Sequence, residues 1–201
     1  MKALEKEYFF PRHPTLKRMG LVGIALLLTG CAGTFSDVKP LAAGVGAPPP
    51  QRPSTLLLGE IKISDARISP ADAQSFIYAL RRGINEWNLT HHAFQSIADQ
   101  VPGAVPPQAL VLTGNITDVE KGNLAMRWIV GMGAGQARLV GDFVFFDDQG
   151  KRLGGFTAQR SYLGGAGAGG ADLLTTEDLF VRLGDEVAES TDKWLKAEHF
   201  D

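Results

Sequence analysis

Two stretches of the chain carry apolar residues at the spacing of an amphipathic helix. The first begins at residues 69–72, where Ser69 suits the N-cap and Pro70 the first helical position, and it predicts a helix to about Asn88. The second follows the capping residues 175–178. Their apolar positions are Ala73, Phe76, Ile77, Leu80, Ile84 and Trp87 in the first, and Leu179, Phe180, Leu183, Val187, Thr191, Trp194 and Leu195 in the second.

Four further stretches predict β-strands. Residues 55–63 and 109–120 each begin as a continuous apolar run and end with alternating apolar and polar residues. Residues 136–146 and 151–163 flank Asp147-Asp148-Gln149-Gly150, which is typical of a hairpin turn. The strand before the turn is apolar on both faces, which predicts a place in the middle of a sheet. A lipid-facing hairpin is the alternative, although one hairpin closes no barrel unless many copies assemble.

These elements follow one another as strand, helix, loop, strand, hairpin and helix. Two amphipathic helices packed against one sheet form a compact layered domain, so the sequence predicts an α+β fold. We expect a mixed sheet of about four to five strands with both helices packed on it.

Two glycine-rich stretches interrupt this pattern. Residues 121–135 contain Gly131, Gly133 and Gly135, but the spacing is not that of a dinucleotide loop and a strand follows instead of a helix. We therefore expect a turn or bulge there. Residues 163–172 include Gly-Gly-Ala-Gly-Ala-Gly-Gly, which is flexible by composition and also permits close approach of another backbone.

The start of the chain has the three parts of an export signal. Lys17 and Arg18 precede an uncharged apolar run over residues 19–28, and small residues surround Cys31, the sole cysteine. This run is about half of the roughly 20 residues that a membrane-spanning helix needs. We expect residues 1–30 to be a lipoprotein signal peptide. The alternative is a free, buried thiol at the end of a core helix.

Leu28-Thr29-Gly30-Cys31 resembles the lipobox of bacterial lipoproteins. The resemblance implies a thioether-linked diacylglycerol on Cys31 and an acyl chain such as palmitate on its new amine, and several acyl chains anchor a protein firmly. Ala32 follows the cysteine. In Gram-negative bacteria an Asp there usually retains a lipoprotein at the inner membrane, so Ala32 implies the outer membrane, with the body on its periplasmic face.

Composition bounds the remainder of the chain. Residues 31–53 contain five prolines with several Gly and Ala, so we expect a tether without fixed structure, about 25 Å long. Residues 54–198 then form a single domain. The whole chain has 20 basic and 22 acidic residues, and residues 1–30 hold five of the basic and two of the acidic ones. Without residues 1–30 the chain has 15 basic and 20 acidic residues, a net charge of −5. A mildly acidic chain without a basic run is a poor nucleic-acid binder.

No residue pattern indicates an enzyme, a metal or a cofactor. His91 and His92 are adjacent and have no cysteine or carboxylate pattern around them, so we expect an ordinary helix end. The last helix carries carboxylates on what we expect to be a solvated face, without a nucleophile or metal ligand beside them. These are Asp185, Glu186, Glu189 and Asp192.

Several features resemble an uncharacterised family of Gram-negative lipoproteins, the domain-of-unknown-function 4410 type. They are Gly122-Asn123, Arg127, residues 130–135, the turn at 147–150 and the closing helix, and the resemblance covers about residues 55–195. The order of elements is also similar to the amino-terminal domain of the translocation protein TolB, to the curli-secretion lipoprotein and to lipoproteins that activate penicillin-binding proteins. This second resemblance rests on topology. It implies a periplasmic module that binds other envelope proteins or itself.

The first functional hypothesis is a non-enzymatic outer-membrane lipoprotein whose domain binds an envelope protein. Loops carry function, and the two glycine-rich stretches supply the candidate contacts. These are Arg127, Trp128, Gly131, Gly133, Gly135, Gly165 and Gly167. The second hypothesis is a self-assembling ring or secretion component, which would be a homo-oligomer. The third, an envelope enzyme, would need a pocket with clustered carboxylates or histidines of perturbed pKa.

Overall fold

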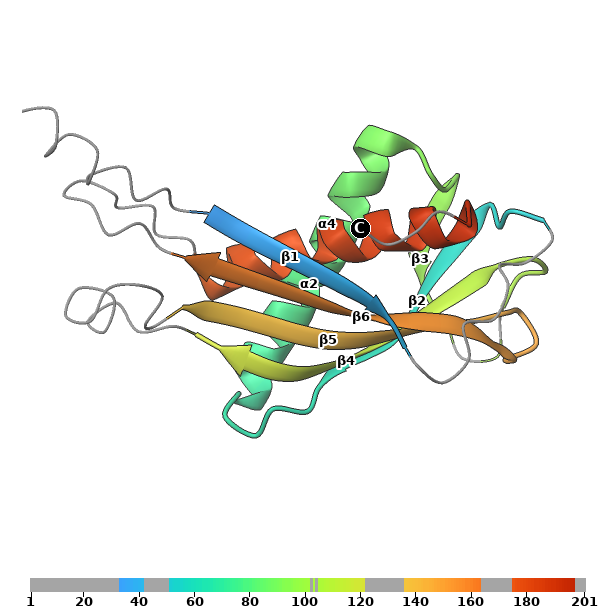
Figure 1. The fold of residues 1–201 in the computed structure, drawn as a ribbon. Coiled ribbons are helices and arrows are strands. Elements are labelled where there is room, and N and C mark those ends of the chain that lie inside the picture. Colours follow the sequence, from blue (N-terminus) through green and yellow to red (C-terminus); the bar gives the residue numbers. More distant parts are fainter. Residues whose placement is uncertain are drawn as a thin grey trace, which may run out of the picture.

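The computed structural model describes residues 33–41, 51–101, 103, 105–121, 136–163 and 175–197. Within these ranges six strands form one mixed sheet, and two long helices cover one of its faces (Figure 1). The strands are β1 Gly33–Pro40, β2 Thr55–Ile63, β3 Ser96–Asp99, β4 Leu110–Glu120, β5 Ala137–Phe146 and β6 Arg152–Leu163, and the helices are α2 Pro70–His91 and α4 Thr176–Leu195. The predicted α+β class is confirmed, with more strands than the four to five expected.

The strand order across the sheet is β1-β6-β5-β4-β2-β3. β2 runs parallel to β3 and β4, and the other neighbours are antiparallel. β5 lies in the middle of the sheet, as its two apolar faces predicted. The predicted turn at 147–150 joins β5 to β6, with Gly150 in the left-handed region at φ 77°.

The core fills the space between the sheet and the two helices. Phe143 and Phe145 of β5 are fully buried, and each ring lies 5.6 Å from the ring of Phe156 on β6. Trp194 of α4 stacks on Phe145 with 4.4 Å between ring centroids. This face of β5 is therefore core, and the alternative of a lipid-facing hairpin is wrong for it.

Both predicted helix starts are confirmed. The hydroxyl of Ser69 accepts a hydrogen bond from a backbone amide in the first turn of α2 at 3.1 Å. Thr175 and Asp178 cap each other's backbone amides at the start of α4. α2 runs past its predicted end and stops where His92 adopts a left-handed conformation with φ 52°. In the part of the chain that the structure describes, no helix is both long and apolar enough to cross a membrane.

The two helices touch through a pair of glycines. A Cβ atom on Gly83 of α2 would lie 2.0 Å from the carbonyl oxygen of Val181, and one on Gly184 of α4 would lie 2.2 Å from that of Leu80. The backbones approach this closely because neither glycine has a side chain. This contact holds both helices over the same face of the sheet.

Strand β1 corrects the expectation that residues 31–53 form a tether without fixed structure. Gly33–Pro40 pairs with β6 at every position, and Val38 is buried in the core. The amide of Leu41 continues the pairing and donates to the carbonyl of Gly155 at 3.0 Å. The physical reason is that β6 supplies partners for the backbone of β1, so this segment needs little apolar surface of its own.

Strand β3 is the other strand that the sequence did not predict. It is four residues long and pairs in parallel with the first half of β2, from Thr55 with Ser96 to Leu58 with Asp99. A segment this short has no periodicity that would distinguish it from a loop. Its pairing partner defines it as a strand.

Candidate functional site

The predicted lipidation site, Cys31, and the predicted partner contacts all lie outside the described residues. The partner contacts are Arg127, Trp128, Gly131, Gly133, Gly135, Gly165 and Gly167. The residues that flank them are described, and these can be placed on the sheet.

All of these flanking residues lie at one end of the sheet. The last residue of β4 pairs beside the start of β5. Ala137, the first residue of β5, pairs with Tyr162, and Gly33, the first residue of β1, pairs with Leu163, the last of β6. We call this the Gly33 end; it lies at the left of Figure 1. The chain therefore enters β1, leaves β4, enters β5 and leaves β6 at the same end of the sheet.

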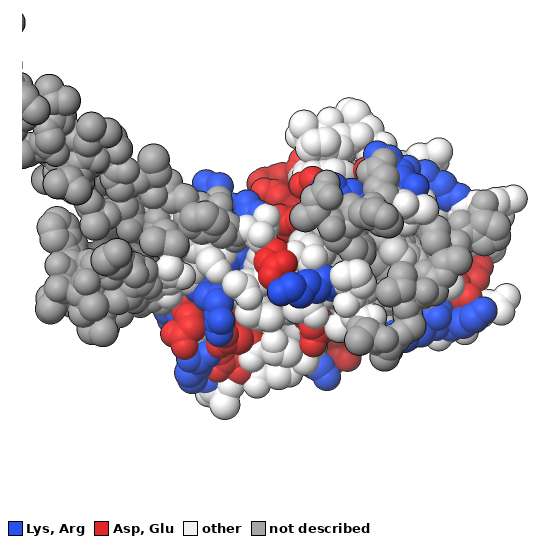
Figure 2. All heavy atoms as spheres, viewed as in Figure 1, with Lys and Arg blue, Asp and Glu red and all other residues white. Residues whose placement is uncertain are grey.

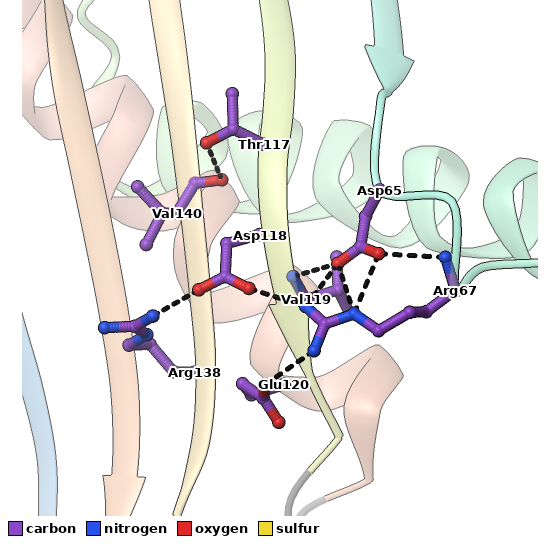
Figure 3. A network of polar contacts seen from close by, with 8 residues as sticks. All are labelled: Asp65, Arg67, Thr117, Asp118, Val119, Glu120, Arg138 and Val140. Carbon is purple, nitrogen blue, oxygen red and sulfur yellow. Dashed lines mark hydrogen bonds and ion pairs between the residues drawn. The ribbon is translucent and has the colours of Figure 1, made fainter.

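Five charged side chains form a network at the Gly33 end (Figure 3). They are Asp65 and Arg67 from the loop between β2 and α2, Asp118 and Glu120 from β4, and Arg138 from β5. The Arg67 guanidinium lies 2.6 Å from one carboxylate oxygen each of Asp65, Asp118 and Glu120. Arg138 contacts the other carboxylate oxygen of Asp118. The network thereby ties the loop to two neighbouring strands.

Asp65 is the most buried member of the network, with 5% of its side chain exposed. Besides the guanidinium, its carboxylate accepts the backbone amides of Arg67 at 2.9 Å and Val119 at 2.8 Å. The hydrogen bonds from Arg67 hold the pKa of Asp65 well below its usual range, and the same contact raises the pKa of Arg67. Both groups remain charged near neutral pH, so this pair suits a fixed structural contact and not proton transfer.

Lys121 extends the network toward the start of α2. Its ammonium lies 3.2 Å from a carboxylate oxygen of Asp72 and 5.6 Å from the centroid of the Phe76 ring. Lys121 is also the first residue of the glycine-rich stretch 121–135 and the one residue of that stretch that the structure describes. Charged pairs therefore surround the point where that stretch leaves the sheet, and Figure 2 shows side chains of both signs next to one another at this end.

Sequence reasoning missed this network. Asp118 lies 51 positions from Arg67, so no local pattern joins the two. The pairing of β4 with β5 also shifts its register between Ile116 and Asp118, and this shift places Glu120 opposite Arg138. The one visible signal is the run of charged residues near the end of a predicted strand, which gives no indication of their partners.

The face of the sheet opposite the helices carries short polar pairs. The Thr157 hydroxyl on β6 donates to the carboxylate of Asp142 on β5 at 2.6 Å. The Ser64 hydroxyl donates to the side-chain oxygen of Asn115 on β4 at 2.5 Å. Half-buried apolar residues such as Val144 lie on the same face. Polar and apolar side chains are thus interspersed here, in contrast to the helix-covered face.

The carboxylates of α4 correct the prediction that they form one solvated face. The Glu186 side chain is 12% exposed, and its carboxylate lies 2.7 Å from Arg160 of β6. Asp192 is buried and pairs with both Arg52 and Lys196. Arginines from β6 and from the segment before β2 reach these positions on α4, which the helical pattern alone does not reveal.

The two adjacent histidines close α2. The His91 ring stacks on Trp87 with 4.2 Å between centroids, and its Nδ1 lies 2.9 Å from the Trp87 carbonyl oxygen. His92 is the residue that caps the helix. Among the described residues, no group of three or more His, Cys, Asp or Glu side chains is placed to hold a metal ion.

Residues 88–166 match the model of the protein family described as "Domain of unknown function (DUF4410)". The match runs from the last turn of α2 beyond the end of β6. It confirms the resemblance to this uncharacterised family. No curated protein matches the chain.

Solved structures that are similar to this chain include the following two. One is a PelC dodecamer from Paraburkholderia phytofirmans, with 12% identity, a TM-score of 0.44, and coverage of 76% of this chain and 94% of that chain. Another is a minor lipoprotein from Acinetobacter baumannii, with 19% identity, a TM-score of 0.34, and coverage of 72% and 91%.

Proposed function

We propose that this protein is an outer-membrane lipoprotein, anchored through Cys31, whose periplasmic domain is a non-enzymatic module that binds an envelope protein. The observation that carries the proposal is the order of basic flank, short apolar run and small residues ending at Leu28-Thr29-Gly30-Cys31. The match to an uncharacterised family over residues 88–166 is compatible with it.

The charged groups of the Gly33 end support a binding role over a catalytic one. Arg67 pairs with three carboxylates, and Asp65 accepts backbone amides as well as the guanidinium. A general acid or base needs a pKa near the working pH, whereas hydrogen bonds from Arg67 keep the pKa of Asp65 low. Such a network gives the two glycine-rich stretches a rigid base from which to contact a partner.

The anchor is tested by Cys31→Ser in cells fed a palmitate analogue. The parent protein should incorporate the label and sediment with outer membranes, and the variant should do neither. Ala32→Asp is the matched control, because it should keep the acyl chains but move the protein to the inner membrane. A Cys31→Ser protein that still fractionated with outer membranes would contradict the anchor.

The partner is tested by a photo-crosslinking residue at position 165 of the acylated protein in intact envelopes. One distinct crosslinked protein would support the binding module and identify its partner. Arg127→Ala combined with Trp128→Ala should remove that product without loss of the fold, as judged by circular dichroism. A series of crosslinked products at multiples of the protein's own mass would favour the second function, a self-assembling component.

A further inference from the structure

The connection between Cys31 and the folded domain is very short. Only Ala32 separates Cys31 from Gly33, which is already paired with Leu163. Consecutive Cα atoms lie about 3.8 Å apart, so the Cα atoms of Cys31 and Gly33 are at most about 8 Å apart. A flexible tether of the whole segment to Pro53 would instead span about 25 Å.

The strand that follows this connection is held by the sheet. β1 pairs with β6 at all positions from Gly33 to Pro40, and Val38 is buried. An acyl anchor at Cys31 therefore acts on a fixed point of the domain, at the Gly33 end. The turn at 147–150 lies at the other end of β5, ten residues away along the strand, which is about 30 Å.

The described surface of the Gly33 end suits the headgroup region of a lipid bilayer. Its cations Arg67, Arg138 and Lys121 each contact a carboxylate of the domain. Together with Asp65, Asp72, Asp118 and Glu120 they form a set of three cations and four anions, and Glu177 and Asp178 in the first turn of α4 add two anions beside the start of α2. The described charges of this end are therefore of both signs, with a small excess of negative charge. Interspersed charges of both signs match the zwitterionic headgroups of phospholipids better than they match a strongly anionic surface.

From this geometry we infer that the Gly33 end of the domain lies directly on the phospholipid surface in which Cys31 is anchored, with the 147–150 turn pointing away from it. This inference rests on the proposed acylation of Cys31. It deepens the proposed function, because the two glycine-rich stretches leave the sheet at this same end. Their protein partner must then lie at, or in, the membrane surface.

The test uses the acylated protein in phosphatidylcholine vesicles that contain a lipid with a nitroxide quencher on its headgroup. Acylation occupies the only native cysteine, so one introduced thiol can be labelled selectively with a fluorophore. Gln136→Cys places the label at the Gly33 end, and Gln149→Cys places it in the turn. We expect several-fold quenching at position 136 and almost none at position 149.

Two further variants make the result decisive. Glu177 lies in the first turn of α4, and its carboxylate accepts a hydrogen bond from Ser75 near the start of α2, so it is also at the Gly33 end. Glu177→Cys, at an exposed position, should therefore also be quenched, and it replaces Gln136→Cys if that half-buried position disturbs folding. A flexible insert of about 20 residues between Ala32 and Gly33 should leave the protein acylated and membrane-bound but abolish the quenching at position 136.

Equal quenching at positions 136 and 149, or quenching at neither, in a protein that carries its acyl chains would overturn the inference. If position 136 were still quenched in the variant with the insert, the short connection between Cys31 and β1 would not be what holds the Gly33 end at the membrane. Failure of this inference can be told apart from failure of the proposed function. A protein that takes up no label from the palmitate analogue lacks the acyl anchor, so the proposed function itself fails.

Discussion

The two faces of the sheet differ in how they are built, and β5 shows the difference along one strand. Phe143 and Phe145 point toward the helices and are fully buried, whereas Val144 and Phe146 point the other way and are half-buried. The helix-covered face is aromatic and closely packed, and the other bears polar pairs such as Thr157 with Asp142. The large hydrophobic cluster thus lies on one face, and the other face holds only a smaller buried cluster of Leu57, Ala109 and Val111 among the described residues.

The largest effect that tests this comparison is expected from Phe143→Ala. The substitution removes a fully buried ring beside Phe156 and leaves a cavity, which costs about 3–5 kcal/mol. Val144→Ala, one residue along on the opposite face, should cost about 1 kcal/mol or less. Urea unfolding of the two purified variants measures both. Similar losses would show that the two faces contribute equally.

A smaller loss is expected from Gly83→Ala. Alanine favours a helix by about 1 kcal/mol over glycine, but its Cβ would lie 2.0 Å from the Val181 carbonyl oxygen and push the helices apart. We expect a net loss of about 2–3 kcal/mol. Gln74→Ala, at an exposed position of the same helix, is the control and should be nearly neutral. A Gly83→Ala protein as stable as the parent would refute the close helix contact.

Asp65→Asn tests the charged network through its pH dependence, with a smaller effect than either core substitution. The pKa of Asp65 in the folded protein lies below its ordinary value of 3.8. The ionised carboxylate therefore stabilises the fold at pH values above 3.8, and this stabilisation is lost as the pH falls from there through the lowered pKa. The variant should be less stable than the parent at pH 7, and the difference should narrow as the pH falls from about 5 to about 2. Urea unfolding over this range measures it. Glu60→Gln, on the exposed part of β2, should show no comparable change.

The smallest effect is expected on the open face, from Thr157→Val. The substitution removes one hydrogen bond to Asp142, whose side chain keeps access to water, and should cost about 0.5–1 kcal/mol. Thermal unfolding is sensitive enough to detect this. A loss as large as that of Phe143→Ala would mean that the polar pairs of this face are essential to the fold.

The elements that the sequence predicted are those whose side chains carry the signal. α2 and α4 have apolar stripes with Ser69 and Thr175 at their starts, and strands β2, β4, β5 and β6 have apolar runs or alternation. β1 contains few apolar residues and exists because β6 pairs with its backbone. β3 is only four residues long. In both cases the information lies in the partner strand, which a local pattern does not include.

The charged network escaped prediction for a related reason. Asp65 and Arg67 form a local pair that the sequence could suggest, but their contacts with Asp118 and Glu120 depend on which strands are neighbours. The same holds for Arg160 and Glu186, which lie on different elements. The candidate contacts Arg127 and Trp128 lie outside the described residues, so their role stays a prediction.

The position of β1 also has a mechanical consequence. The hydrogen bonds of an antiparallel pair run perpendicular to the strands. A force that pulls Cys31 away from the Gly33 end would act along the axis of β1. The hydrogen bonds between β1 and β6 would then be loaded in shear, all at the same time, instead of opening one after another. Gly33 pairs with Leu163, 130 positions later in the chain. A pull on the proposed acyl anchor would thus be carried directly to β6, the strand beside β1 in the sheet.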